Sequence, residues 1–201
     1  MGRTYFLAWR KDFGRARSLR GYTGIPMATE TKLSLEEFLE ADYGREVELV
    51  DGELWERHVG NFSHSRIEAL LAAWFIQNEY RWGAVALIEM DTIVLPSSLL
   101  KPDVALVPFG AMPDRLVDPP LLAVEILSPT DRLVSTKRKC EKYRQMGVRS
   151  MWIIDPESRT GLMWDGERWV EARRLEVLGT AIFVELDDLF ARLDASRAPQ
   201  R

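Results

Sequence analysis

Apolar side chains recur with a helical period in two long segments of the chain. From Ser63 onward they are spaced three and four residues apart, which predicts an amphipathic helix that ends near Gly83. The members of this stripe are Ile67, Leu70, Leu71, Trp74 and Phe75. A second helix is expected over residues 133–146, where Gly147 supplies a typical helix end. A capping box that begins at Ser34 predicts a short helix before them.

The remaining apolar runs predict strands. Leu121–Leu127 is almost continuously apolar, which is typical of a strand buried on both faces. Val85–Leu95 predicts one long strand, and Asp51-Gly52 favours a tight hairpin turn between two strand-like runs. Further strands are expected over 103–107, 151–154, 162–164, 168–170 and 183–185, and a last helix over 187–193. From Ser63 the order is helix, three strands, helix, strand, which predicts an α/β domain with a mixed sheet flanked by helices.

The composition narrows the class of protein. The chain has 201 residues, of which 46% are hydrophobic and 29% charged, as in ordinary globular domains. The single cysteine, Cys140, excludes an internal disulfide, and with only two histidines a structural zinc site is not expected. No apolar run approaches the roughly 20 residues of a membrane span. We therefore expect a cytoplasmic protein that does not enter membranes.

The charge is unevenly distributed. The net charge of −4 would by itself argue against a nucleic-acid-binding protein. Residues 1–26, however, carry +5 and residues 27–201 carry −9, while the stretch 132–149 carries +6. We expect residues 1–26 to be an N-terminal extension outside the fold and residues 27–201 to form a single domain. The local basic stretch leaves nucleic acid open as a partner.

Two acidic residues stand out in the predicted strands. Glu125 lies inside an apolar strand, where a carboxylate is costly unless it is paired, protonated or bound to a metal. The structural alternative is a salt bridge with a buried arginine. Asp103 begins the preceding strand, directly after Pro102, where an aspartate is also a common turn residue. Its position one strand before Glu125 makes it a candidate for the same site.

Lys139 is the basic residue that the helical period directs inward. On the predicted helix 133–146 it lies close to the apolar stripe formed by Cys140, Tyr143 and Met146. It either pairs with an acid of the preceding strand or extends its ammonium group to solvent. The other basic side chains of this helix point outward, and they form either a solvated face or a surface that contacts phosphates: Lys137, Arg138, Lys142 and Arg144.

Weaker candidates complete the set. Glu48 alternates with Val47 and Leu49, so it faces either solvent or a site. His64 begins the first long helix, where a polar cap is the ordinary interpretation. Glu89 and Asp91 share one face of the predicted strand Val85–Leu95 and are reserve acids.

Taken in order, these segments resemble the Uma-two family of predicted endonucleases, within the PD-(D/E)XK or restriction-endonuclease-like superfamily. The segments that carry the resemblance are Val47–Leu54, His64 at a helix start, Lys101–Val104, Val124–Pro129, Lys139 with Tyr143, and Met146–Pro156. The resemblance covers roughly Leu33 to the C-terminal helix and leaves out residues 1–26.

The resemblance implies an αβββαβ core and a metal site held by Asp103 and Glu125. The superfamily pattern places a lysine two residues after Glu125, where this chain has Leu127; in the Uma-two family the lysine has moved to the next helix, and Lys139 matches that position. An acid that often stands one turn earlier is replaced by Ser135. Glu48 and His64 match recurrent family positions. The family's habits and the exposed hairpin edges also suggest a homodimer.

These observations predict a metal-dependent endonuclease that hydrolyses phosphodiester bonds, with DNA as the expected substrate. Asp103, Glu125 and the carbonyl of Ile126 would hold Mg²⁺ or Mn²⁺, and Glu48 would complete the metal shell or hold a second ion. Lys139 would orient water or neutralise charge on the phosphoryl group. The alternative is a catalytically inactive module of the same fold that binds nucleic acid or protein, which Leu127 and the acidic body favour.

Overall fold

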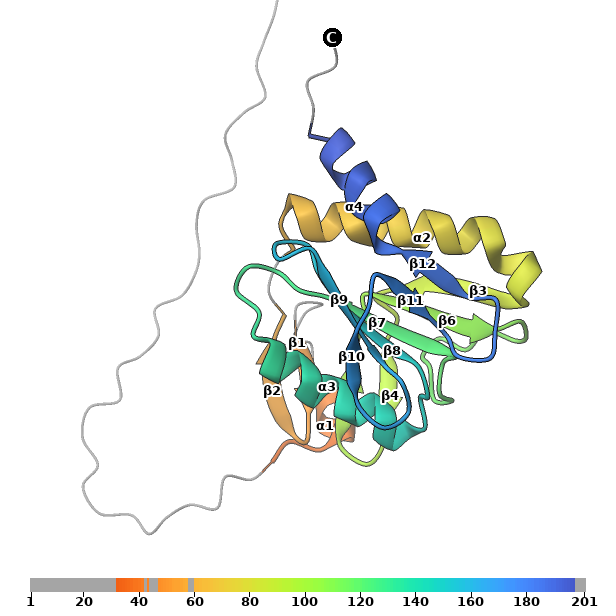
Figure 1. The fold of residues 1–201 in the computed structure, drawn as a ribbon. Helices are drawn as coiled ribbons and strands as arrows, with labels where there is room; N and C mark the ends of the chain where they lie inside the picture. Colours follow the sequence, from red (N-terminus) through yellow and green to blue (C-terminus); the bar gives the residue numbers. More distant parts are fainter. Residues whose placement is uncertain (1–31, 42, 44–46, 58–59, 198–201) are drawn as a thin grey trace, which may run out of the picture. The chain divides into compact units, whose positions relative to one another are not determined.

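The computed structural model describes residues 32–41, 43, 47–57 and 60–197, all of which fall in the same unit of the chain (Figure 1). The predicted N-terminal extension, residues 1–26, lies outside the described residues. In the described part of the chain, no helix is long and apolar enough to cross a membrane.

A six-stranded mixed sheet forms the centre of the fold. Its strand order is β10-β9-β8-β7-β6-β3, and only the β7–β8 pair is parallel. The bounds are β3 Ala84–Ile88, β6 Val104–Pro108, β7 Leu122–Ile126, β8 Met151–Asp155, β9 Thr160–Trp164 and β10 Trp169–Glu171. The mixed sheet predicted from the sequence is confirmed.

Helices cover both faces of this sheet. The helices α2 (Phe62–Trp82) and α4 (Leu186–Ala195) lie on one face, and α3 (Leu133–Met146) lies on the other (Figure 1). Because side chains alternate along β7, Leu122, Val124 and Ile126 pack toward α2 and α4, whereas Ala123 packs toward α3. Glu125 falls in the same alternating set as Ala123. The strand period therefore directs its carboxylate toward α3.

A second sheet adjoins the α3 side, with strand order β2-β1-β5-β4. Its strands are β1 Val47–Val50, β2 Glu53–Glu56, β4 Thr92–Val94 and β5 Ser98–Leu100. The helix α1 (Leu35–Glu40) starts with the predicted capping box and packs Phe38 against this sheet. The strands β11 (Arg174–Glu176) and β12 (Phe183–Glu185) form a separate hairpin.

The prediction of one long strand over Val85–Leu95 was wrong. β3 ends at Ile88 and pairs with β6, whereas β4 begins at Thr92 and pairs with β5 in the other sheet. The chain turns at Glu89, whose φ of 49° is incompatible with a continuing strand. Glu89 and Asp91 therefore do not share a strand face.

Candidate active site

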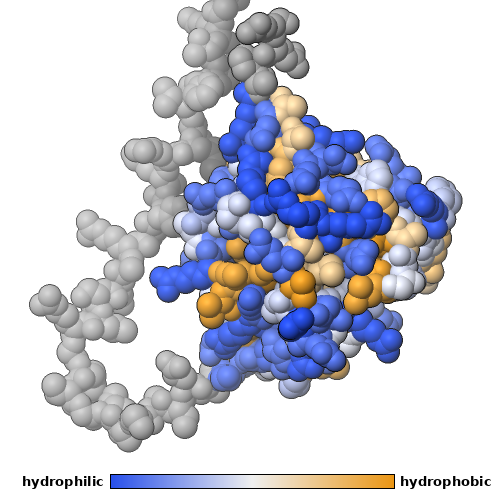
Figure 2. Space-filling view, in the orientation of Figure 1, coloured by the Kyte–Doolittle hydropathy of each residue, from blue (hydrophilic) through white to orange (hydrophobic). Residues whose placement is uncertain are grey.

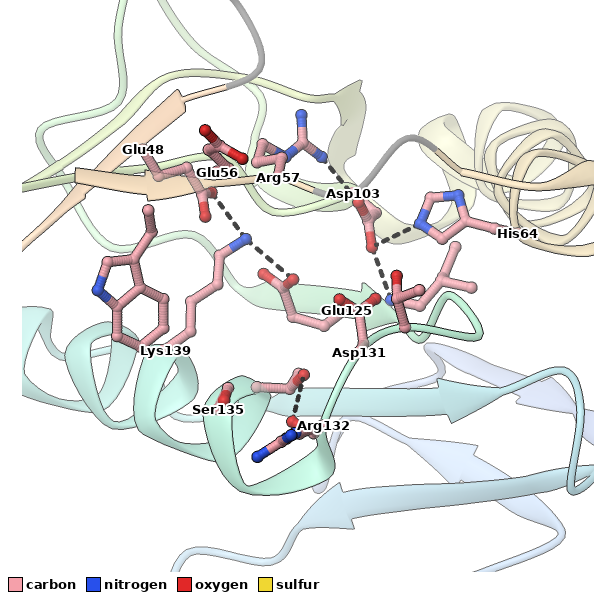
Figure 3. Close-up of a pocket in the computed structure, with 14 residues that line it drawn as sticks. Glu48, Glu56, Arg57, His64, Asp103, Glu125, Asp131, Arg132, Ser135 and Lys139 are labelled. Carbon is pink, nitrogen blue, oxygen red and sulfur yellow. Dashed lines mark hydrogen bonds and ion pairs between the residues drawn. The ribbon is translucent and has the colours of Figure 1, made fainter. Parts of the chain in front are cut away.

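A cavity of about 440 Å³ opens between the β1–β2 hairpin, the ends of β6 and β7, and the first turns of α3 (Figure 3). Acidic, basic and hydroxyl side chains dominate its wall. The residues that line it are Glu48, Trp55, Glu56, Arg57, His64, Asp103, Glu125, Ile126, Thr130, Asp131, Arg132, Ser135, Thr136 and Lys139. The five residues that the sequence singled out as catalytic candidates all lie in this one cavity.

Strand pairing brings the two principal acids together. β6 and β7 are antiparallel with Val104 opposite Val124, so continuing the register by one residue places Asp103 opposite Glu125. Asp103, Glu125 and Glu48 are nearly inaccessible, with only 4%, 6% and 4% of their surface exposed. Three buried carboxylates from three different strands or strand ends thus face one cavity.

Asp103 is held by donors on both of its oxygens. Its Oδ2 accepts a hydrogen bond from the backbone N–H of Ile126 at 2.6 Å, and His64 Nε2 lies 3.4 Å from the same oxygen. Its Oδ1 accepts a hydrogen bond from Arg57 at 2.9 Å. These contacts fix the direction of the carboxylate at the floor of the cavity.

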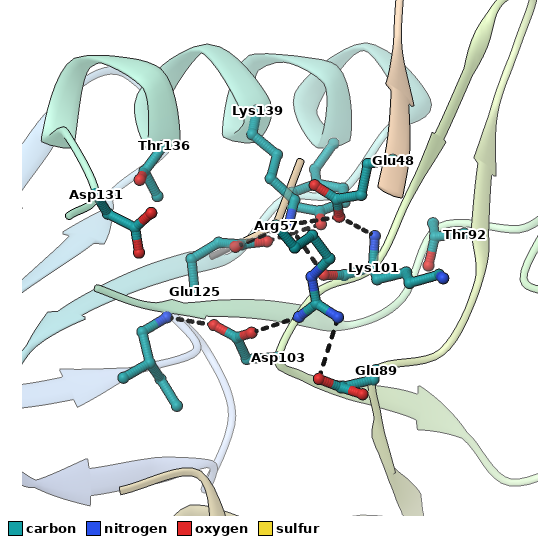
Figure 4. Close-up of polar contacts among 12 residues, drawn as sticks. Glu48, Arg57, Glu89, Thr92, Lys101, Asp103, Glu125, Asp131, Thr136 and Lys139 are labelled. Atoms are coloured by element: carbon teal, nitrogen blue, oxygen red, sulfur yellow. Dashed lines mark hydrogen bonds and ion pairs between the residues drawn. The ribbon is translucent and has the colours of Figure 1, made fainter. Parts of the chain in front are cut away.

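Lys139 connects the other two carboxylates (Figure 4). Its Nζ lies 2.7 Å from Glu48 Oε1 and 3.0 Å from Glu125 Oε2, and it donates to the carbonyl of Lys101 at 2.9 Å. The Tyr143 hydroxyl donates to the other oxygen of Glu125 at 2.8 Å. The inward direction predicted for Lys139 is observed. Its ammonium group is buried and paired, so it does not extend to solvent, and the cation beside Glu125 is a lysine, not an arginine.

The pKa values of Glu125 and Lys139 are shifted because both groups are buried close to other charged groups. Burial raises the pKa of Glu125 to about 8 against the opposing charge of Lys139, and the charges of Asp103 and Glu48 add to the rise. Burial lowers the pKa of Lys139, but Glu125 and Glu48 outweigh that effect and raise it above its usual value. Lys139 therefore stays cationic, and Glu125 holds its proton to a higher pH than an ordinary glutamate does.

His64 and Asp103 shift in a complementary way. Burial opposes the charged form of each, yet the hydrogen bond between them raises the pKa of His64 and lowers that of Asp103. The positive charge of Lys139 also lowers the pKa of Asp103. The interaction thus favours a carboxylate at Asp103 and a protonated imidazole at His64.

The structure decides between the alternatives for the weaker candidates. The side chain that caps α2 belongs to Asn61, which accepts from the backbone N–H of His64, so His64 does not cap the helix. Glu48 is buried and does not face solvent, because its carboxylate points into the cavity and contacts Lys139 of α3.

Four charged residues of the cavity wall were not singled out from the sequence: Glu56, Arg57, Asp131 and Arg132. Arg57 follows β2 and reaches both Asp103 and Glu89, which lie 46 and 32 residues away in the chain. The alternation of β2, which places Trp55 opposite Glu48, could have indicated the inward position of Arg57. No local pattern indicates its partners.

The other basic residues of α3 lie outside this cavity wall, and three of the four contact acids of the chain itself. The outward direction predicted for Lys142 is wrong, because its side chain is only 14% exposed. Lys142 lies 2.7 Å from Asp51, and Arg138 lies 3.5 Å from Glu53 and stacks over Trp55. Arg144 pairs with Glu141 of its own helix, and Lys137 lies over the ring of Trp169. The reserve acid Asp91 likewise pairs with Lys101 and Arg115.

The donor set suits a hard divalent cation, although the described residues contain no ready-formed cluster of three or more metal-ligating side chains. Mg²⁺ and Mn²⁺ prefer carboxylate and carbonyl oxygens, which the cavity floor supplies. Asp103 receives donor contacts from Arg57, Ile126 and His64, and a carboxylate has about four lone-pair sites, so it keeps room for one more ligand. The raised pKa of Glu125 also shows that its charged form is destabilised by burial and by the neighbouring acids, and an added cation would stabilise that charged form.

A comparison with models of protein families shows to which family the chain belongs. Residues 35–193 match the model of the Uma2 family, described as "Putative restriction endonuclease". The chain belongs to the Uma2 family. The match leaves out residues 1–34 and 194–201 and includes all of the candidate site residues. The resemblance inferred from the sequence is confirmed.

Solved structures place the Uma2 chain in a known fold. A protein from Anabaena variabilis described as "a putative nuclease belonging to DUF820" is 18% identical, with a TM-score of 0.72; the alignment covers 80% of this chain and 99% of that one. The restriction-endonuclease-like fold is thereby confirmed. The DrdV–DNA complex matches with a TM-score of 0.39 and 13% identity over 67% of this chain and 12% of that one. A search of curated proteins found no match.

Proposed function

We propose that this protein is a metal-dependent endonuclease that hydrolyses phosphodiester bonds in DNA. The observation that carries the proposal is the set of three buried carboxylates, Glu48, Asp103 and Glu125, around the buried ammonium group of Lys139. Membership in a restriction endonuclease family supports a nuclease over the alternative of an inactive binding module.

Asp103, Glu125 and the carbonyl of Ile126 would hold Mg²⁺ or Mn²⁺, and Glu48 would complete the shell. When bound, such an ion polarises a phosphate oxygen and lowers the pKa of a coordinated water. Ile126 serves the site twice, because its N–H holds Asp103 in place while its carbonyl is a ligand candidate.

Lys139 and His64 have distinct roles in this proposal. Since the pKa of Lys139 is raised, it acts as a fixed cation that neutralises charge developing on the phosphoryl oxygens, and it is unsuited to accept a proton. His64 orients Asp103 through Nε2 and keeps it ionised.

The basic face of α3 would contact the DNA backbone beyond the cavity through Lys137, Arg138, Lys142 and Arg144. A phosphate that binds there has to displace Asp51, Glu53 or Glu141 from three of these side chains. This face would therefore contribute modestly to the affinity for DNA and more to the orientation of the DNA on the protein. The predicted homodimer and cytoplasmic location stay predictions.

The deciding experiment measures cleavage of plasmid and single-stranded DNA with and without Mg²⁺ or Mn²⁺. Glu125→Gln keeps the size of the side chain and removes a charged ligand, so we expect activity to fall about 100-fold or more. Glu171→Gln, at an exposed position of β10, is the matched control and should retain wild-type activity. Equal cleavage by wild type and Glu125→Gln would refute the site; no cleavage by wild type with either ion would favour the inactive module.

A further inference from the structure

Arg57 is the basic residue of the cavity whose role the proposed chemistry leaves open. It follows β2, lines the cavity and has a side chain that is only 13% exposed. Its Nη2 donates to Asp103 at 2.9 Å and its Nη1 to Glu89 at 3.1 Å (Figure 4). Two carboxylates on different strand ends therefore hold the guanidinium plane beside the floor of the cavity.

This arrangement leaves part of the guanidinium available for a ligand. The group carries five N–H donors. Among the residues that the structure describes, its hydrogen bonds go to Glu89 and Asp103, which use two of those donors. An arginine that is oriented in advance loses little rotamer freedom when it binds an anion, and its planar fork matches a phosphate.

A phosphate that enters the cavity needs a cation beside it, because the wall is rich in acidic residues. Five carboxylates line the wall: Glu48, Glu56, Asp103, Glu125 and Asp131. The three acceptors around Lys139 already use all of its N–H donors, and Arg132 is exposed at the rim. A polyanion that approaches Asp103 therefore meets Arg57 and His64, of which only Arg57 has the planar fork that matches a phosphate.

We propose that Arg57 binds the phosphate group at the cleavage position of the DNA backbone, with Glu89 and Asp103 aiming the guanidinium. This inference rests on the proposed nuclease function and names the residue that receives the substrate. Arg57 would bind the substrate phosphate directly, whereas Glu89, which is not part of the cavity wall, would be a positioning residue.

Binding of DNA without cleavage provides the first test. The probe is a fluorescein-labelled single-stranded oligonucleotide, titrated with Glu125→Gln protein and with the same protein carrying Arg57→Met. Because a charge-assisted hydrogen bond to phosphate is lost, we expect Kd to rise about 10- to 150-fold. Arg57→Lys keeps the positive charge but lacks the planar guanidinium, and it should raise Kd by a smaller factor. Arg115→Met removes an exposed arginine that pairs with Asp91 outside the cavity, and it should leave Kd unchanged.

A chemical change in the substrate locates the contact. Replacing the phosphate at the mapped cleavage position by an uncharged methylphosphonate should weaken binding to the Glu125→Gln protein and have much less effect when Arg57→Met is also present. Such non-additivity identifies two groups that touch. If the two losses are independent, or if Arg57→Met folds normally by thermal unfolding and keeps the parental Kd, the assignment is wrong.

Kinetics separate phosphate binding from a purely structural role. In an otherwise wild-type protein, Arg57→Met should raise KM; a fall in kcat with KM and Kd unchanged would mean that Arg57 only positions Asp103, which overturns the inference. If the wild type does not cleave DNA at all, the proposed function fails. The oligonucleotide titration then still decides whether Arg57 binds phosphate.

Discussion

Lys139 balances two buried carboxylates with one positive charge, and this makes it an unusually sensitive residue. All three of its N–H donors are used, by Glu48, Glu125 and the carbonyl of Lys101. In a buried ion pair, loss of one partner costs far more than the net value of the pair, because the remaining charge is left without compensation. The same group that would assist catalysis therefore supports the fold.

Replacing Lys139 by methionine should lower the free energy of unfolding by about 3–5 kcal/mol in the absence of metal. The stem of the side chain is preserved, so the effect reports the missing charge and not a cavity. Urea unfolding measures it. Lys137→Met is the matched control on the same helix; its ammonium group lies over Trp169, away from the buried acids, and its loss should change stability by less than about 1 kcal/mol. Equal effects of the two substitutions would contradict the charge-balance argument.

Glu68 shows a second consequence of the acidic interior. It lies on α2 one turn after His64, and its Oε1 is buried without a hydrogen-bond partner among the described residues. Burial raises its pKa to about 7, and the negative charge of Asp103 adds to the rise. The folded protein therefore binds a proton at Glu68 that the unfolded chain releases near its ordinary pKa.

This difference gives a pH dependence with a definite sign. Between about pH 4.5 and pH 7 the folded state binds more protons at Glu68, so its contribution to stability declines as the pH rises. Glu68→Gln cannot ionise and should be more stable than wild type by about 1–2 kcal/mol at pH 8, with little difference at pH 4.5. Urea unfolding in EDTA at both pH values measures this. Glu157→Gln, at an exposed position, should follow the wild type; a gain for Glu68→Gln that does not depend on pH would point to another cause.

At the scale of elements, the β1–β2 hairpin carries Glu48 and leads directly to Arg57, so its turn positions two parts of the site. Gly52 in that turn has φ +81°, and a Cβ atom there would lie 2.6 Å from the Cβ of Lys32 and 2.9 Å from the carbonyl of Leu33. The turn is also tied to other segments, since Gly52 donates to the carbonyl of Ser97 and accepts from the N–H of Leu33. These hydrogen bonds hold the β1–β2 hairpin in place at its turn.

Gly52→Ala should combine backbone strain with a steric clash and lower the free energy of unfolding by about 2–3 kcal/mol. Gly166→Ala is a well-matched control, because that glycine occupies a second Asp-Gly hairpin with φ +105°, and a Cβ atom there would meet no other atom within 4 Å. It should lose only about 1 kcal/mol, from strain alone. Thermal and urea unfolding compare the two variants, and a loss at Gly166 as large as that at Gly52 would show that the clash contributes nothing.

Local patterns predicted the elements that periodicity and capping determine. The capping box at Ser34, the helix 133–146 and the Asp-Gly turns are all observed, because each depends on residues close in sequence. The break at Glu89 and the strand β5 were not predicted, since β3 pairs with β6 and β5 pairs with the distant β1. The strand β11 was also missed; it has only three residues and pairs with the neighbouring β12. Lys139 was predictable because a helical period decides its direction, whereas the partners of Arg57 depend on tertiary packing.

At the scale of the whole molecule, the acidic residues of the candidate site are buried. Figure 2 shows hydrophilic side chains over most of one face, with apolar side chains in separate small groups. The net charge of −4 says little about substrate, because part of the negative charge lies buried in the candidate site and not on the surface. A cation that enters this site would relieve repulsion among Glu48, Asp103 and Glu125, and it would bind the folded chain alone.

Divalent cations should therefore raise the melting temperature of the whole protein. At a concentration of about 100 times Kd, binding to the folded state adds about 2.7 kcal/mol, which for a chain of this size corresponds to a rise of about 5–10 °C. Differential scanning fluorimetry with millimolar Mg²⁺ or Mn²⁺ measures the shift, and Asp103→Asn should abolish most of it because the amide cannot supply the lost charge. Asp114→Asn, at an exposed position outside the cavity, should retain the full shift. If both ions leave the wild-type melting temperature unchanged, or if Asp103→Asn responds as strongly as wild type, the carboxylates do not hold a metal. Because this measurement needs no substrate, it tests the metal site independently of whether DNA is cleaved.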